Sequence, residues 1–138
     1  MKKTFIDSGV LIAAARGNLE EPTKQMTLKA WEILDDVNRY FISTTYVEME
    51  VLPKATYFKK QEEVNFYNDY FASVHEWIRC DESLLQLAFQ NASSYGLSCI
   101  DALHTTAAFL AGIDEFVTTE KSTRSIHNAT FINVVSIS

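Results

Sequence analysis

Several acidic residues are spaced along the chain so that each follows a short apolar segment or lies in the helix expected after one. They are Asp7, Glu48, Glu50, Asp101 and Glu120. Carboxylates that meet at one point repel each other unless a cation joins them. An all-oxygen ligand set favours a hard ion, Mg²⁺ or Mn²⁺. If the fold brings these acids together, the chemistry they support is that of a divalent metal ion.

Three of these acids also have a structural alternative. Asp7 could simply cap the helix expected to begin near Gly9. The run Ser98-Cys99-Ile100-Asp101 fits a capping box, although that role is compatible with metal binding. Glu120 lies in a polar segment and could be a solvated surface group; its position after an apolar strand favours the ligand role.

Glu48 and Glu50 compete for one role, because residues two apart on a helix point to nearly opposite sides. The run from Thr45 to Glu48 matches a capping box, which gives Glu48 a structural role. We therefore favour Glu50 as the metal ligand and keep Glu48 as the alternative.

Other polar residues near these acids could support the same chemistry. His104 lies one helical turn from Asp101 and could contact a phosphate, but a satisfied, partly buried histidine is the interpretation we favour. Lys54, Lys121 and Arg124 could hold backbone phosphates or could be solvated surface charges. No histidine is paired by sequence with a cysteine nucleophile, and no glycine-rich phosphate loop is present.

The elements that must position these residues alternate between short apolar strands and helices. This alternation predicts an α/β fold with a mostly parallel sheet, in which residues after the strands meet at one edge. We predict strands at 5–6, 40–44, 76–80, 115–118 and 131–137. We predict helices at 10–15, 22–37, 46–52, 59–74, 82–95 and 99–111, the third of them ending near Pro53.

Composition limits the classes of protein that this chain can represent. Its 138 residues, 47% hydrophobic and 22% charged, predict one globular domain over residues 1–138. A net charge of −6 argues against a broad basic nucleic-acid surface, but not against an acidic pocket offset by a cation. Cys80 and Cys99 lack metal-ligand spacing, so we expect buried free thiols in a reducing cytoplasm. No apolar run reaches the ~20 residues of a membrane helix, and none follows the N-terminus as in a signal peptide.

Taken together, four segments resemble the PIN-domain ribonucleases, and in particular the VapC-like toxins of toxin–antitoxin pairs. In chain order they are Phe5-Ile6-Asp7-Ser8-Gly9-Val10-Leu11-Ile12, Glu50-Val51-Leu52-Pro53-Lys54, Ile100-Asp101-Ala102-Leu103-His104 and Val117-Thr118-Thr119-Glu120-Lys121. The sequence departs from the family pattern at Glu120, where Asp is usual, and at Gly9, where many members carry Asn.

The resemblance implies a three-layer α/β/α sandwich with a mostly parallel sheet in the order 3-2-1-4-5. It implies a metal-dependent endoribonuclease that uses Mg²⁺ or Mn²⁺, held by the residues that match the family's acids. These are Asp7, Glu50, Asp101 and Glu120, with Thr118 similar to the hydroxyl residue that often lies beside the fourth acid. The implied partners are an RNA substrate, a small antitoxin and a second copy of the chain. The alternative is a catalytically incomplete PIN fold that binds RNA or protein without turnover, which the Glu120 departure favours. The helix at 59–74 could be a contact surface or part of the core.

Overall fold

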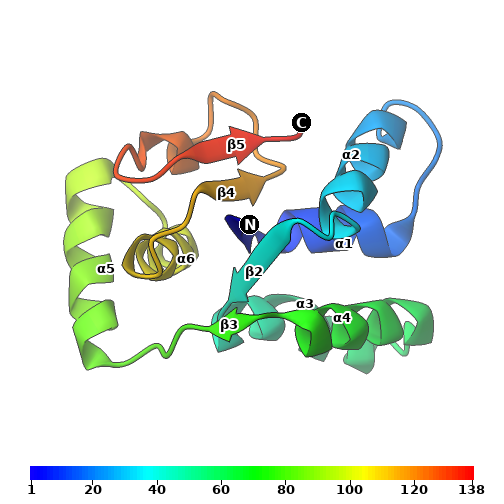
Figure 1. Cartoon of the computed structure of the whole chain (residues 1–138), viewed down its shortest axis with the longest axis horizontal. Helices are drawn as coiled ribbons and strands as arrows, with labels where there is room; N and C mark the ends of the chain where they lie inside the picture. Colours follow the sequence, from blue (N-terminus) through cyan, green and yellow to red (C-terminus); the bar gives the residue numbers. More distant parts are fainter.

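A five-stranded parallel sheet forms the centre of the computed structural model, which describes residues 1–138 (Figure 1). The strand order is β3-β2-β1-β4-β5, which confirms the predicted order 3-2-1-4-5. The strands are β1 (Lys2–Ile6), β2 (Arg39–Ser43), β3 (Glu76–Trp77), β4 (Glu115–Thr118) and β5 (Val134–Ser136). The helices are α1 (Ser8–Arg16), α2 (Lys24–Leu34), α3 (Thr45–Tyr57), α4 (Gln61–Ser73), α5 (Glu82–Tyr95) and α6 (Cys99–Leu110).

Strands β1 and β4 are neighbours in the interior of the sheet and are covered on both faces. Phe5 and Ile6 of β1 and Phe116 and Val117 of β4 are fully buried, as a parallel sheet between helices requires. Phe5 stacks on Phe116 across the pair, with the ring centroids 5.3 Å apart. The parallel register aligns Ile6 with Val117, so both strands end at the same edge of the sheet.

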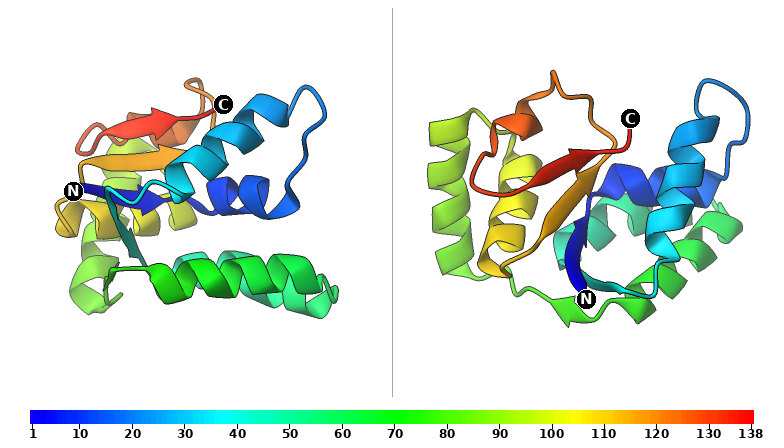
Figure 2. Two further views of the ribbon diagram at one scale, coloured as in Figure 1. Left: turned by 45° about the vertical axis from the view of Figure 1, so that its right-hand side comes forward. Right: turned by 45° about the horizontal axis from the view of Figure 1, so that its top comes forward.

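The helices flank this sheet in pairs, as the views of Figure 2 show. Helix α1 packs against α2 and α4, α3 packs against α4 and α6, and α5 packs against α6. Helix α6 is the most buried of them, with every residue from Ala102 to Ala108 buried. No helix of the structure has the length and apolarity that a membrane span needs.

Helix α3 is longer than predicted. It continues through Pro53 to Tyr57, whereas its predicted end lies near the proline. Pro53 cannot donate a backbone hydrogen bond, but Val51 and Ala55 on either side of it are buried in the core. Packing on both sides therefore keeps the helix continuous. The predicted strands at 76–80 and 131–137 are longer than β3 and β5, which pair only at 76–77 and 134–136.

The aromatic residues of α4 belong to the core. Tyr67, Tyr70 and Phe71 are all buried, and Tyr70 lies edge-on to Phe41 of β2. Of the two interpretations of this segment, core packing is therefore correct for these three rings.

Candidate metal centre

Asp7 lies where β1 ends and α1 begins, at the centre of the sheet edge. Its Oδ1 accepts a hydrogen bond of 2.9 Å from the backbone N–H of Ser8, so it does cap α1. Its Oδ2 accepts a bond of 2.8 Å from the hydroxyl of Thr118, the last residue of β4. The side chain is buried. Capping and the link to β4 together fix the orientation of this carboxylate.

Glu50 and His104 reach the same place from two helices. His104 Nε2, on α6, contacts Glu50 Oε1, on α3. One ligand atom from each of Asp7, Glu50 and His104 lies within 4.8 Å of the other two. The Glu50 side chain is 31% exposed, whereas the His104 ring is fully buried and lies near the Phe5 ring, with centroids 5.9 Å apart. Three elements thus meet in one potential metal-binding group, which opens to solvent on the Glu50 side.

Asp101 lies beside this group, in the first turn of α6. Its backbone N–H donates to Ser98 Oγ at 3.2 Å, which confirms that Ser98 caps the helix. Burial is the main cause that raises the Asp101 pKa; the charges of Glu120 and Glu50 raise it further, while Ser98 and His104 lower it. Asp101 is therefore close enough to feel the other acids, although it is outside the 4.8 Å group.

Glu120 lies farther from the centre. Its side chain is 47% exposed, and its Oε2 is 3.5 Å from Arg124 Nε. Its backbone N–H donates to Thr118 Oγ1 at 3.1 Å, and the charge of its side chain raises the pKa of Asp101. The structure therefore gives Glu120 an ion-pair partner of its own and does not bring it into the group formed by Asp7, Glu50 and His104.

Glu48 does not have the structural role predicted for it. Helix α3 begins at Thr45, its N-cap is Thr44, and no side chain caps it, so the predicted capping box is wrong. The capping box needs the hydroxyl one residue before the helix, and here the match is out of register by one residue. Glu50, and not Glu48, is the residue of this pair that reaches His104 and Asp7.

Burial in this acidic setting raises the pKa of Asp7 to about 6. Removal from water is the main cause, and the charges of Asp101 and Glu50 act in the same direction. His104 and the hydrogen bond from Thr118 lower the pKa without cancelling these effects. A buried carboxylate with acidic neighbours is a group that a cation stabilises.

Gly9 is needed here because of a close approach. A Cβ at this position would collide with Oγ1 of Thr119, in the loop that follows β4. The glycine therefore lets the first turn of α1 pack against the segment that carries Thr118 and Glu120.

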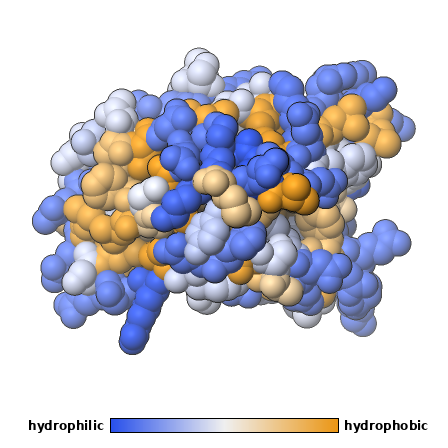
Figure 3. Space-filling model, viewed as in Figure 1, coloured by the Kyte–Doolittle hydropathy of each residue, from blue (hydrophilic) through white to orange (hydrophobic).

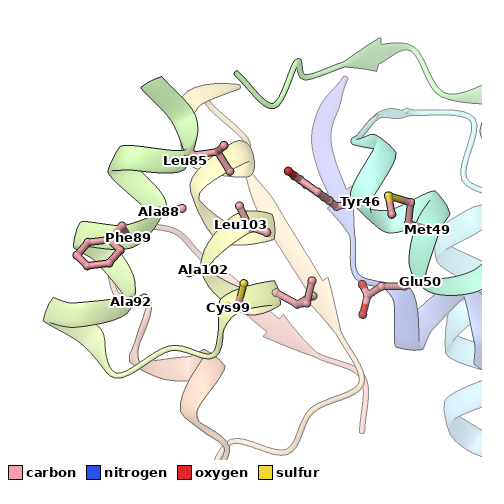
Figure 4. Close-up of a pocket in the computed structure, with 11 residues that line it drawn as sticks. Tyr46, Met49, Glu50, Leu85, Ala88, Phe89, Ala92, Cys99, Ala102 and Leu103 are labelled. Carbon is pink, nitrogen blue, oxygen red and sulfur yellow. The ribbon is translucent and has the colours of Figure 1, made fainter. Parts of the chain in front are cut away.

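Two hollows adjoin the group on either side of Glu50. An apolar groove of about 780 Å³ lies between α3, α5 and α6, and Figure 4 shows Tyr46 and Glu50 extending from α3 toward α6 across it. Apolar residues gather on the side of the molecule where α5 lies (Figure 3). Cys99 lines this groove and is exposed, so the prediction of a buried thiol is wrong for it; Cys80 is only partly buried. A smaller hollow on the other side is lined by Glu50, Lys54 and Phe58 among others.

His104 has a larger part in the site than its sequence position indicates. The predicted satisfied histidine is wrong for Nδ1, which is buried without a hydrogen-bond partner, whereas Nε2 faces Glu50. Its spacing of three residues from Asp101 was the available signal, since it places both on one side of α6.

The sequence matches no protein-family model and no curated protein. Solved structures are similar in fold over almost the whole chain. One is a toxin–antitoxin complex from Klebsiella pneumoniae, with a TM-score of 0.72, 18% identity and 98% of each chain covered. Another is VapBC2 from Rickettsia felis bound to a DNA fragment from their promoter, with a TM-score of 0.68, 14% identity, and 97% of this chain and 98% of that chain covered. The chain therefore has the PIN-like α/β/α fold that its resemblance to VapC-like proteins implies.

Proposed function

We propose that this chain is a metal-dependent endoribonuclease that acts as a VapC-like toxin. The observation that carries the proposal is the meeting of Asp7 and Glu50, beside the buried His104, at the edge where the central strands end. Ligands of open α/β sheets bind at this edge. The fold shared with proteins of toxin–antitoxin complexes supports the same conclusion.

The donor set fits Mg²⁺ or Mn²⁺. Asp7 and Glu50 offer carboxylate oxygens from different elements, and Asp101 adds a third carboxylate nearby. Hard divalent ions prefer oxygen ligands, and a positive charge would offset the burial and the acidic neighbours that raise the pKa of Asp7. We propose Asp7, Glu50 and Asp101 as the ligands, with Glu120 as an outer acid. His104 is proposed as a positioning residue that orients Glu50.

The chemistry proposed is hydrolysis of an RNA phosphodiester bond. When bound, the divalent ion would lower the pKa of water and offset charge on the phosphate oxygens. Asp7 remains fixed by Ser8 and Thr118, so its carboxylate needs no reorganisation. His104 holds Glu50 in place across the site from Asp7. Lys54, on the same face of α3 as Glu50, is placed to contact a phosphate of the RNA.

The partners proposed are an RNA substrate, a small antitoxin and a second copy of the chain. The complexes that share this fold support an antitoxin, and the apolar groove offers exposed side chains of Met49, Leu85 and Phe89 to a protein partner. The two free cysteines fit a reducing compartment, so we propose the cytoplasm as the location.

The proposal is tested by Mn²⁺-dependent cleavage of structured RNA. We expect the wild type to cleave and Asp7→Asn to lose at least a hundredfold in rate, because it loses a ligand charge at the centre of the group. Glu32→Gln, a change on α2, is the matched control and should cleave as the wild type does. Equal cleavage by Asp7→Asn and the wild type would reject the proposed site.

One observation favours a second candidate, a PIN fold that binds without turnover. Glu120 is paired with Arg124, so the fourth acid of the family pattern is not directed to the group at Asp7. This candidate predicts RNA binding by the wild type with no cleavage in Mg²⁺ or Mn²⁺, and no gain in melting temperature on adding either ion.

A further inference from the structure

The second half of α3 and its turn into α4 have a surface unlike the rest of this acidic protein. Residues 51–61 contain three lysines, Lys54, Lys59 and Lys60, and no acidic residue, in a chain whose net charge is −6. Two aromatic residues lie between these lysines, and both are exposed: Tyr57 by 79% and Phe58 by 58%. Adjacent aromatic rings left in water together with lysines are the combination that binds single-stranded nucleic acid.

This surface is continuous with the candidate metal centre. Glu50, Lys54 and Phe58 are spaced four residues apart, which places them on one face of α3, and all three line the same hollow. At about 1.5 Å per residue, Phe58 lies roughly 12 Å along the helix from Glu50. Tyr57 is the last residue of α3 and Phe58 its C-cap. This end of the α3–α4 pair points away from β2 and β3 (Figure 2, left). A nucleic-acid strand bound at the candidate metal centre can therefore extend outward along this face of α3.

The basic side chains along this face differ in whether they form an ion pair with an acidic residue. Arg16 and Lys60 also line the hollow, but both pair with Glu63, at 3.5 Å and 3.8 Å. Lys54 has no ion-pair partner and is exposed, so its charge is free for an anion. Lys54 is also the lysine nearest to Glu50 in the helix. The free charge thus lies between the acids and the aromatic pair.

We propose that Lys54, Tyr57 and Phe58 form a binding platform for single-stranded RNA that leads the substrate to the metal centre. Lys54 contacts a phosphate, and the ring of Tyr57 or Phe58 stacks on a base. The two rings are perpendicular, with centroids 5.1 Å apart, so they offer faces in two directions and not one continuous stack. The platform rests on the proposed ribonuclease function, because the strand bound there is its substrate.

The class of partner follows from the mixture of charge and aromatic surface. A base presents a flat face to an aromatic ring whatever its sequence, and the phosphate beside it needs a cation. In a duplex the bases are stacked on each other and their faces are not available. The platform should therefore distinguish single strands from duplexes.

The test measures RNA binding without cleavage. Fluorescence anisotropy of a labelled, short single-stranded RNA of mixed sequence is recorded in EDTA, so no metal-dependent turnover contributes. We expect the double variant Tyr57→Ala/Phe58→Ala to bind about tenfold more weakly or worse than the wild type. Lys54→Gln should reduce the salt dependence, the slope of log K against log salt, by about 0.7. All three residues are exposed, so the fold should be retained, which the far-UV circular dichroism spectrum checks.

Matched controls come from other faces of the molecule. Phe109→Ala removes an exposed aromatic ring on α6, and Lys29→Gln removes an exposed lysine on α2. Neither should change the affinity for single-stranded RNA. The duplex formed with the complementary strand should bind more weakly than the single strand, and its affinity should not depend on Tyr57 and Phe58.

Three outcomes would overturn the platform. They are equal affinity of the double variant and the wild type, a loss of affinity in Phe109→Ala as large as that in the double variant, and a double variant that changes oligomeric state while its RNA affinity is unchanged. The last would make this face a protein interface. Failure of the proposed function is seen separately: binding that depends on the platform, with no cleavage in Mn²⁺, keeps the platform and rejects the nuclease.

Discussion

Thr118 donates a hydrogen bond of 2.8 Å to the carboxylate of Asp7, although 111 residues separate them in the chain. The same hydroxyl accepts a bond of 3.1 Å from the backbone N–H of Glu120. One buried side chain therefore joins the ends of β1 and β4 and the loop that follows β4. This link fixes Asp7 at the point where the proposed metal ligands meet.

Replacing Thr118 should show how much these hydrogen bonds contribute to the stability of the protein. Thr118→Val keeps the shape of the side chain but leaves the N–H of Glu120 and Oδ2 of Asp7 without their partner. We expect a loss of about 1–3 kcal/mol in the free energy of unfolding, measured in urea without metal. Thr118→Ser keeps the hydroxyl and should lose much less. A valine variant as stable as the wild type would show that the hydroxyl does not organise this edge.

The raised pKa of Asp7 predicts a pH dependence of stability in the metal-free protein. The folded state binds a proton at Asp7 up to about pH 6, whereas the unfolded chain releases it near its ordinary value of 3.8. The stabilisation from this proton is fully present below 3.8 and is lost as the pH rises through about 6. Asp7→Asn carries no ionisable group there, so its stability relative to the wild type should increase between pH 4 and pH 7. Urea unfolding of both proteins in EDTA measures the difference between their free energies of unfolding. This difference should not change between pH 4 and pH 7 if Asp7 has an ordinary pKa.

Glu120 and Asp101 should differ in their effect on metal affinity. Asp101 is partly buried and interacts with the other acids, while Glu120 is half exposed and paired with Arg124. We expect Asp101→Asn to weaken Mn²⁺ binding by tenfold or more and Glu120→Gln to weaken it by less than threefold, since an exposed charge at a distance is screened. Mn²⁺ titrations of the two variants provide the comparison. A larger loss in Glu120→Gln would make Glu120 a ligand in its own right.

The sheet could be predicted from the sequence because its strands have a clear local pattern. The buried pairs Phe5-Ile6 and Phe116-Val117 identify two of its inner strands, and Asp7 follows the first pair directly. Helix ends were predicted correctly where a side chain caps them, as at Ser98, whose Oγ accepts from the backbone N–H of Asp101. A helix end was predicted wrongly where tertiary packing determines it. Helix α3 continues past Pro53 because Val51 and Ala55, on either side of the proline, are buried in the core.

The arrangement of side chains within the site could not be read from spacing. Nothing in the sequence places His104 against Glu50, because that contact depends on how α6 packs against α3. The ion pair between Glu120 and Arg124 depends on the conformation of the loop after β4. Residue spacing predicts which side chains share a face of one helix, but it does not predict contacts between side chains on different elements.

The central claim is that Asp7 and Glu50 hold a divalent cation, and calorimetric titration with Mn²⁺ tests it most directly. We expect the wild type to bind Mn²⁺ and both Asp7→Asn and Glu50→Gln to bind at least tenfold more weakly. Glu48→Gln, two residues away on the same helix, is the matched control and should bind as the wild type does, because only Glu50 belongs to the group at Asp7. Mn²⁺ affinity that is the same in the wild type, Asp7→Asn and Glu50→Gln would contradict the claim.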